Sequence, residues 1–418
     1  MRQLLCLLTI AVSLLSCSGG LTGSSQGEGD TVAFKYATQL TVVRYDGYTV
    51  ATIKNPWNDG KILHQYVLVA DSLLADNGER PDVAGEFAHA TIIRTPLKRS
   101  MIFSTVHCAM LMEMGKQACI SGVADLKYIK IPWIQEQVAQ GKIADVGDGL
   151  SPVVEKIIDR HPDALFMSPF ENSGGYGKLE EIGIPIVECA EYMEPSPLAR
   201  AEWLRFYGML FGCERRADSL FHATDSCYSA LKAIAREAGE NGNTGENGDT
   251  GENGENGDSR NTGDSRNTGD SGLSGGKSPS ILMDKLTGNV WYVPGGRSTL
   301  GQMIADANGE YAWAKDEHSG SISLPLEAVL EKAGDADAWV FRYGGDHTIS
   351  YDELRREHHG YKQFKAFADH QVYGCNVEQS TFYEETPFHP DWLLNDFIRI
   401  LHPEKEGLAP LRYFQKLN

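Results

Sequence analysis

The residues with the most chemical potential fall next to expected strand ends and helix starts, where open α/β folds place their ligand sites. Aromatic side chains there suit a large planar or macrocyclic ligand, and Arg297 or a helix N-terminus suits an anionic one. The candidate binding residues from the first half of the chain are Ser104, Thr105, His107, Phe170, Glu171 and Asn172. Those from the second half are Trp291, Tyr292, Arg297, Ser298 and Tyr343.

Each of these candidates also has a structural interpretation that needs no ligand. Ser104 and Ser298 could do no more than cap helices, because a serine hydroxyl accepts hydrogen bonds from the first free backbone N–H groups of a helix. Trp291 could be a core residue, and His107 could pack within its helix. The residue types alone leave both interpretations open.

Enzymatic function is disfavoured, although an exported, lipid-anchored hydrolase remains an alternative. Ser104, His107 and a distant aspartate could form a triad, but no Gly-x-Ser-x-Gly elbow surrounds Ser104. A P-loop, a Gly-x-Gly-x-x-Gly turn after a strand and a His-Glu-x-x-His helix are also missing from the sequence. We therefore predict no catalytic residue and no cofactor.

A receptor that binds a metal ion directly is a second alternative. The C-terminal third is rich in histidine, but the spacing does not bring these residues together on one element, so no metal site is predicted. The formal net charge of −19 argues against nucleic acid as a partner, because phosphate binding needs a basic surface. The histidines concerned are His347, His358, His359, His370 and His389.

The N-terminus has the features of an export signal. A basic start precedes an apolar run over 4–15, which is too short for a stable membrane span. The sequence Leu-Leu-Ser-Cys that ends at Cys17 resembles a bacterial lipobox, in which the cysteine is acylated and anchors the protein to a membrane. We predict a lipoprotein signal at 1–17 and a flexible tether at 18–33. An ordinary signal peptide with an incidental cysteine is the alternative.

One helix–strand unit occurs twice. In the first copy, Ser151 and Pro152 are expected to cap and begin a helix, and 164–167 is an apolar run typical of a buried strand. In the second copy, a proline and an apolar residue precede Glu327, and an Asp-Ala turn then leads into a strand that ends at Phe341. The repetition indicates two similar lobes.

Short apolar strands alternate with helical segments along most of the chain, which predicts mainly parallel sheets with helices on both faces. We expect a first α/β lobe over 34–195 and a second over 279–418. The first lobe is expected to begin with a hairpin that turns at Asp46 and Gly47. Further strands are expected at 64–70, 91–93, 119–123, 143–144, 164–167, 184–188, 280–283, 290–293 and 371–373.

The two expected lobes are separated by two unlike segments. Residues 196–238 have one helical pattern, which predicts either a single connecting helix or two helices broken near Gly212. Residues 239–278 are of low complexity and lack aromatic and β-branched apolar residues, so they are expected to form a disordered linker.

These features together resemble one family, the class III periplasmic binding proteins of ABC importers for ferric siderophores, haem and cobalamin. The resemblance extends over 42–403, and its best pieces are Val-Glu-Lys-Ile-Ile-Asp-Arg-His-Pro-Asp-Ala-Leu-Phe at 154–166 and the serine-bearing turn and helix in 291–301. It implies two Rossmann-like lobes joined by a long helix, with a ligand cleft between them. It also implies an iron chelate, haem or cobalamin as ligand, and a permease and ATPase as partners.

The resemblance gives a role to Glu155 and Glu327, which stand at matching motif positions in the two units. In that family an exposed glutamate of each lobe docks onto permease arginines, and two fixed carboxylates suit a two-fold symmetric partner. The alternative is that both are first-turn acids favoured by the helix dipole. The resemblance thus predicts a substrate-binding lipoprotein of the cell envelope, facing the periplasm or the outside, and no enzyme.

Overall fold

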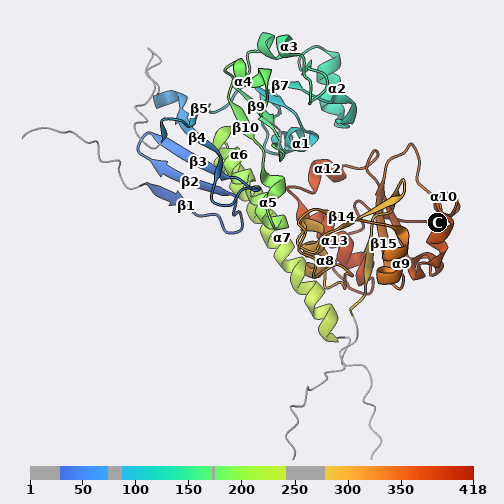
Figure 1. Cartoon of the computed structure of the whole chain (residues 1–418). Coiled ribbons are helices and arrows are strands. Elements are labelled where there is room, and N and C mark those ends of the chain that lie inside the picture. Colours follow the sequence, from blue (N-terminus) through green and yellow to red (C-terminus); the bar gives the residue numbers. More distant parts are fainter. Residues whose placement is uncertain (1–28, 74–86, 172–174, 242–277) are drawn as a thin grey trace, which may run out of the picture.

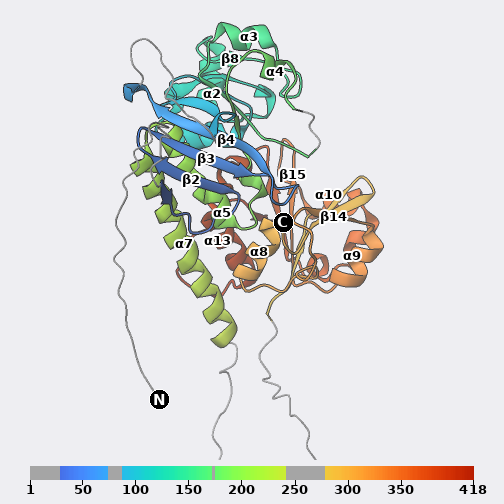
Figure 2. The same cartoon turned by 60° about the vertical axis from the view of Figure 1, so that its left-hand side comes forward.

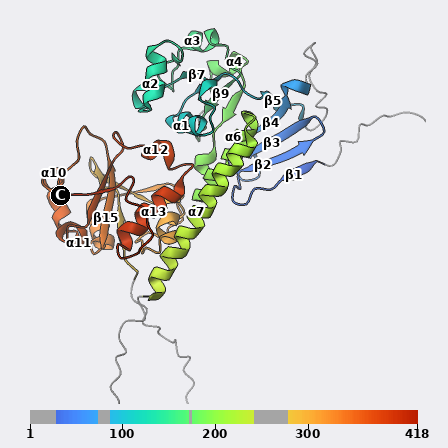
Figure 3. The ribbon, with the colours of Figure 1, turned by 180° about the vertical axis from the view of Figure 1, so that it is seen from behind.

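The computed structural model describes residues 29–73, 87–171, 175–241 and 278–418. These residues form two α/β lobes, and a long helix, α7 (Glu214–Asn241), runs alongside both of them (Figure 1). Seen from behind, the same helix crosses from the first lobe to the second (Figure 3). The predicted fold class, two α/β lobes joined by a long connecting helix, is confirmed.

The first lobe begins with a five-stranded sheet in the order β1-β2-β3-β4-β5, antiparallel except for the parallel pair β4 and β5. Figure 2 shows this sheet beside α7. The predicted hairpin is present, because Tyr45 pairs with Tyr48 and Gly47 takes a φ of 83° in the turn. The strands are β1 (Asp30–Val32), β2 (Leu40–Tyr45), β3 (Tyr48–Lys54), β4 (Ile62–Ala70) and β5 (Thr91–Thr95).

A second five-stranded sheet in the first lobe, β10-β9-β6-β7-β8, is parallel throughout. Because parallel strands run the same way, the loops after their carboxyl ends gather at one edge of the sheet. Its strands are β6 (Ser100–Ile102), β7 (Ile120–Val123), β8 (Ala144–Asp145), β9 (Ala164–Met167) and β10 (Ile186–Glu188). The accompanying helices are α1 (Thr105–Glu113), α2 (Pro132–Ala139), α3 (Val154–Asp159) and α4 (Lys178–Glu181).

For the helix–strand unit that was predicted to begin at Ser151, the predicted strand is confirmed, but the predicted helix cap at Ser151 is wrong. All four residues of β9 are buried, as expected for a covered strand. Helix α3, however, has Val153 at its N-cap and no capping side chain. The backbone N–H of Val153 instead donates to the carbonyl of Val146 at 2.8 Å, so Ser151 and Pro152 belong to the loop that follows β8.

The helical pattern over 196–238 is divided into α5 (Pro197–Glu202), α6 (Leu204–Leu210) and α7, so a single helix over this whole range was wrong. The chain turns at Gly212, whose φ is 60°. The break at Gly212 agrees with the alternative prediction of two helices, although the structure also separates α5 from α6 before that point. Helix α7 packs against α6 of the first lobe and α13 (Pro390–Leu401) of the second. Most of the expected linker at 239–278 lies outside the described residues.

The second lobe has a four-stranded sheet, β11-β15-β16-β17, in which only β17 is antiparallel, and a three-stranded antiparallel sheet, β12-β13-β14. The strands expected at 280–283 and 290–293 are present, but a hairpin between them, which their closeness in sequence would suggest, is not formed. β11 instead pairs with β15, and the hairpin partner of β13 is β12. The strands are β11 (Ile281–Met283), β12 (Leu286–Thr287), β13 (Val290–Pro294), β14 (Ser321–Leu324), β15 (Ala338–Tyr343), β16 (Val372–Asn376) and β17 (Gln415–Lys416).

The remaining helices of the second lobe are α8 (Thr299–Asp306), α9 (Leu326–Ala333), α10 (Tyr351–Glu357), α11 (Lys365–Ala368), α12 (Phe382–Glu385) and α13. Their apolar faces enclose a core around Trp291 and Trp339, whose rings lie 5.6 Å apart. The first lobe has its own core, which includes Trp203 and Phe166. Within the described ranges, no helix has the length and apolar character needed to cross a bilayer.

Candidate functional site

The first lobe has a hollow of about 520 Å³ at the carboxyl edge of its parallel sheet, which we call the lobe-1 hollow. Phe103 follows β6, Leu150 lies in the loop after β8, and Phe170 follows β9. Leu150 is 87% exposed and Phe170 is 51% exposed, so both offer apolar surface to a ligand. The other lining residues are Asp125, Gly149, Ser151, Pro152, Val154, Met167, Ser168, Gly175, Tyr176, Gly177, Lys178 and Leu179.

Tyr176 is fixed in the wall of this hollow by a buried carboxylate. Its hydroxyl donates to Glu188 Oε2 at 2.6 Å, at the end of the edge strand β10. Burial raises the pKa of Glu188, and burial together with the charge of Glu188 raises the pKa of Tyr176. The tyrosine hydroxyl therefore stays protonated and holds its ring in one orientation.

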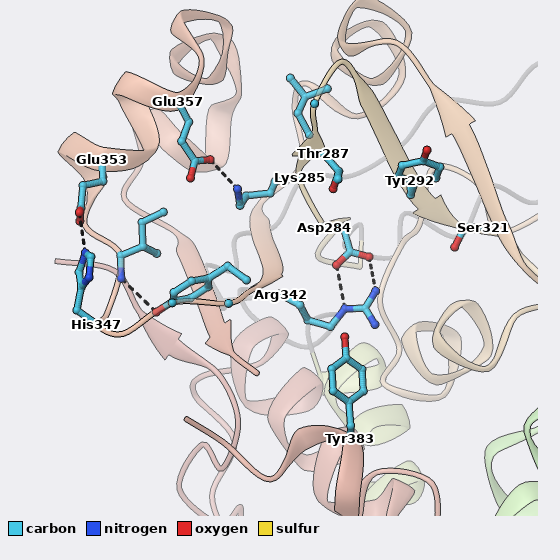
Figure 4. A pocket seen from close by; sticks show the side chains of 16 residues that line it. Asp284, Lys285, Thr287, Tyr292, Ser321, Arg342, His347, Glu353, Glu357 and Tyr383 are labelled. Atoms are coloured by element: carbon cyan, nitrogen blue, oxygen red, sulfur yellow. Dashed lines mark hydrogen bonds and ion pairs between the residues drawn. The ribbon is translucent and has the colours of Figure 1, made fainter. Parts of the chain in front are cut away.

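The second lobe has a hollow of about 670 Å³, the lobe-2 hollow, at the carboxyl ends of β11 and β15 (Figure 4). It is more polar than the lobe-1 hollow, and the rings of Tyr292 and Tyr383 are 44% and 46% exposed. The other lining residues are Asp284, Lys285, Leu286, Thr287, Gly288, Ser321, Arg342, Tyr343, Gly344, Gly345, His347, Ile349, Glu353 and Glu357.

The basic side chains of the lobe-2 hollow are held in ion pairs. Arg342 makes two parallel hydrogen bonds to Asp284, of 3.0 and 2.6 Å, and Lys285 contacts Glu357 at 2.6 Å (Figure 4). Burial would lower the pKa of Arg342, but the Asp284 carboxylate outweighs burial and raises it. Arg342 is therefore permanently charged and already compensated.

An exposed histidine completes this side of the lobe-2 hollow. The ring of His347 contacts Asp346 and Glu353, each at 2.7 Å. The hydrogen bonds that the imidazole donates to these two carboxylates raise the pKa of His347, and the hydrogen bonds that Glu353 accepts from His347 and Ser350 lower the pKa of Glu353 to about 2. Protonated His347 thus also has its charge balanced by neighbouring acids.

A contact between the lobes lies between the two hollows. Thr105 Oγ1, at the start of α1, donates to Glu384 Oε1 of α12 at 2.9 Å. Phe103 of the lobe-1 hollow lies two residues before Thr105, and Tyr383 of the lobe-2 hollow directly precedes Glu384. Each hollow therefore has a lining residue close in sequence to this interlobe contact, and we take the two hollows together as the candidate cleft.

A second interlobe contact lies along the same helix α1. His389 Nε2 contacts Glu113 Oε1 at 2.7 Å, and the His389 ring stacks on Trp392 with their centroids 3.8 Å apart. A smaller hollow of about 320 Å³, with Met112 and Phe388 in its walls, lies between α1 and the α12–α13 region. These contacts hold the lobes together on the side of α1.

The structure brings together some of the candidate binding residues. Phe170 lines the lobe-1 hollow, Tyr292 and Tyr343 line the lobe-2 hollow, and Thr105 lies between them. Ser104 caps α1 by accepting the N–H of Val106, as its structural interpretation requires. Glu171 is exposed next to Phe170, and Asn172 lies outside the described residues.

Other candidates lie elsewhere, which corrects the sequence-based placement. Trp291 is fully buried and its indole N–H donates to the Met283 carbonyl, so it belongs to the core. His107 is 1% exposed and also internal. Arg297 lines neither hollow and pairs with Glu317, and Ser298 caps α8.

His107 belongs to a buried cluster with Cys189 and Glu191, whose potential ligand atoms lie within 4.8 Å of one another. Glu191 accepts hydrogen bonds from Tyr207 at 2.8 Å and lies 3.3 Å from His107. Burial would raise the pKa of Glu191, but the charges and hydrogen bonds of His107, Arg200 and Tyr207 lower it to about 2. The positive charge of the half-buried Arg200 also favours the ionised form of this carboxylate. The cluster is therefore a core hydrogen-bond network that lines neither hollow.

The histidines of the C-terminal third do not assemble into a common site in the described part of the chain. His347 pairs with acids of the lobe-2 hollow, whereas His389 contacts Glu113 of the first lobe. His358 stacks on His359, and His370 lies against Tyr351.

The candidate binding residues chosen from the sequence include none of the charged residues that line the two hollows. Asp284 directly follows β11, so its position at a strand end could have identified it as a binding candidate. Arg342 lies within β15 and has no such signal. Leu150 was missed because it is an apolar residue in a loop, and Tyr383 because α12 was not predicted. Their roles depend on which strands become neighbours.

The chain thus has two α/β lobes, each with a hollow at the carboxyl ends of parallel strands, and one long helix beside both, which is the architecture of a two-lobed binding protein. The chain matches the family described as periplasmic binding protein over residues 117–244 and 271–378, which is more than half of its length. The chain therefore belongs to this family, and the resemblance to its class III is confirmed. The match leaves out 245–270, within the low-complexity segment.

Solved structures share this fold. A periplasmic haem-binding protein from Pseudomonas aeruginosa has a TM-score of 0.54 at 13% identity, covering 77% of this chain and 98% of that one. A TroA-like periplasmic binding protein from Veillonella parvula has a TM-score of 0.51 at 14% identity, covering 78% and 96%. At these identities the likeness concerns the fold.

Two curated relatives extend over nearly the whole chain. Both are uncharacterized lipoproteins of Methanocaldococcus jannaschii. One is 25% identical over 407 residues, 93% of this chain and 86% of the relative. The other is 22% identical over 417 residues, 95% of this chain and 92% of the relative.

Proposed function

We propose that this protein captures a chelated iron, haem or cobalamin-type ligand between its lobes and delivers it to the permease of an ABC importer. The observation that carries the proposal is the pair of hollows on either side of the Thr105–Glu384 contact, one on each lobe. Their volumes of about 520 and 670 Å³ suit a ligand larger than a single metal ion. Exposed rings at Phe170, Tyr292 and Tyr383 supply flat contact surfaces.

The experiment that tests capture is titration calorimetry of the purified protein with a panel of ligands. The panel contains haem, a corrinoid, a ferric trihydroxamate and a ferric tricatecholate. We expect tight, one-to-one binding of at least one ligand, which is recovered chemically unchanged. Conversion of a bound ligand, or no binding to any of the four, would refute the proposal.

We further propose that Glu155 and Glu327 dock onto the permease. Both are exposed in the first turns of α3 and α9, and these helices belong to different lobes. Exchanging both for lysine is expected to abolish transport while ligand affinity stays unchanged, because neither residue lines a hollow. Exchange of Glu331 for lysine, on the same helix as Glu327, is the matched control. Normal transport in the double variant would refute the proposed docking role.

Anchoring through Cys17 is the third part of the proposal. Cys17 lies outside the described residues, so the support comes from the lipobox-like sequence and from two relatives named as lipoproteins. An acylated cysteine would keep the binding lobes at the outer face of the cytoplasmic membrane or at the cell surface. Cys17→Ser is expected to move the protein from the membrane fraction to the soluble fraction. Unchanged membrane association would refute this anchor.

A further inference from the structure

Among the residues that the structure describes, the lining of the lobe-2 hollow carries no surplus of positive charge. Its ionised side chains are three carboxylates and two permanent cations, with one histidine beside them. The carboxylates are those of Asp284, Glu353 and Glu357, the cations are Lys285 and Arg342, and the histidine is His347. Even with His347 protonated, positive and negative charges in this lining only cancel.

Both permanent cations of this hollow are already committed to carboxylates. Arg342 binds Asp284 through two nitrogen atoms, and side-chain exposures of 28% and 14% show that this pair is largely removed from water. Lys285 is 17% exposed and contacts Glu357 at 2.6 Å. An anionic ligand group would have to displace a carboxylate, which would leave that carboxylate unpaired at a partly buried position.

The lobe-1 hollow does not supply the missing positive charge. The described part of its lining is mainly apolar and aromatic, and the charged residues in that part are Asp125 and the exposed Lys178. Arg297, which the sequence suggested for an anionic ligand, lies outside both hollows and pairs with Glu317. The formal net charge of the chain, −19, adds a general repulsion toward anions.

We infer that the ligand is an uncharged or cationic metal chelate or corrinoid with one apolar face. Its apolar face would lie against Phe103, Leu150 and Phe170 of the first lobe. Its polar or cationic part would face the exposed rings of Tyr292 and Tyr383, since aromatic faces attract cations. Ligands with several negative charges, such as haem with two carboxylates or a ferric tricatecholate, are disfavoured. This inference rests on the proposed function.

The test varies charge on a constant scaffold. A ferric trihydroxamate with a pendant amine is cationic, its N-acetyl derivative is neutral, and its N-succinyl derivative is anionic. For corrinoids, the matched pair is the parent amide and the derivative in which one side-chain amide is hydrolysed to a carboxylate. Calorimetry at low ionic strength is expected to show the tightest binding for the cationic derivative, then the neutral one, then the anionic one. The affinity should fall about tenfold each time the net charge of the ligand falls by one unit.

The outcomes separate this inference from the proposed function. Equal or tighter binding of the anionic member of a pair, or binding of haem or the tricatecholate alone, would overturn the charge assignment while ligand capture stands. Failure of every ligand in both series and in the panel would overturn both. Tighter binding of the cationic or neutral member supports both.

One substitution checks that the charge preference comes from the lobe-2 hollow. Glu357→Gln removes the partner of Lys285 at a position where the glutamate is 38% exposed, so the fold is expected to persist. The affinity ratio of anionic to cationic derivative should rise about tenfold. Glu331→Gln, an exposed acid of α9 outside both hollows, removes the same charge and should leave the ratio unchanged. Equal shifts in both variants would mean that only the overall charge matters and would overturn the assignment.

Discussion

Removal of one hydroxyl group, in Tyr66→Phe, should destabilise the first lobe strongly. Tyr66 of β4 is fully buried, and its hydroxyl donates to the carbonyl of Ile186 at 3.0 Å while it accepts the N–H of Glu188 at 2.8 Å. Both partners belong to β10, which is the edge strand of the parallel sheet. Tyr66 therefore satisfies the backbone groups that the edge strand leaves unpaired.

The magnitude follows from the two groups that lose a partner. A buried N–H or C=O without a hydrogen bond costs about 1–3 kcal/mol, so the two groups together should cost about 2–6 kcal/mol in the free energy of unfolding. Phenylalanine keeps the ring packed, including its contact with His64 at 4.5 Å between centroids, so no cavity is added.

Urea unfolding followed by circular dichroism measures this loss. The midpoint should fall while the slope of free energy against urea stays constant, because the surface exposed on unfolding is unchanged. Tyr48→Phe is the control, since its hydroxyl makes no hydrogen bond within the described residues. A loss below about 0.5 kcal/mol in Tyr66→Phe, equal to that of the control, would refute the claim that this hydroxyl completes the sheet edge.

Four further predictions concern the rest of the chain. Thr105→Val should cost about 1–3 kcal/mol in unfolding free energy, because Glu384 loses its donor across the lobes, and Thr105→Ser should restore it. Gly212→Ala should cost about 1–2 kcal/mol from its positive φ, and more than Gly141→Ala, because only at Gly212 would the new Cβ meet Pro96, at 3.0 Å. The pKa of Glu191 lies near 2 in the fold, below its ordinary value of 4.5, so its stabilisation, on the order of 3 kcal/mol, is present above pH 4.5 and lost as the pH falls toward 2. Acid titration of stability should show this loss in the native chain and not in Glu191→Gln. Deletion of 245–270, which the family match omits, should change stability by no more than about 1 kcal/mol and leave ligand affinity intact in calorimetry.

The elements that the sequence predicted well are those whose signals are local. The Asp46-Gly47 turn and the buried run of β9 each follow from neighbouring residue types. Ser151 misled because a serine–proline pair is equally suited to a loop. In this chain the loop gains a hydrogen bond from Val153 to Val146, next to the end of β8.

The candidate cleft was harder to predict because its charges are set by partners far apart in the chain. Asp284 and Arg342 are separated by 58 residues and meet only because β11 lies beside β15. Before that neighbour is known, Arg342 is an isolated basic residue in a strand and Arg297 is the more prominent cation. Once β11 pairs with β15, Arg342 becomes the more important of the two arginines, because it lines the lobe-2 hollow whereas Arg297 faces solvent.

The unlike linings of the two lobes assign them different parts in the proposed capture. The lobe-1 hollow exposes apolar side chains such as Leu150 and Phe170, and covering them with ligand would supply hydrophobic free energy with little directional preference. The lobe-2 hollow holds its polar groups in existing ion pairs, so Arg342 and Lys285 lose little conformational freedom when a ligand arrives. Fixed polar groups reject a ligand whose charges do not match them, because a mismatched group is left unpaired. Affinity should therefore depend mainly on the first lobe and discrimination among ligands mainly on the second.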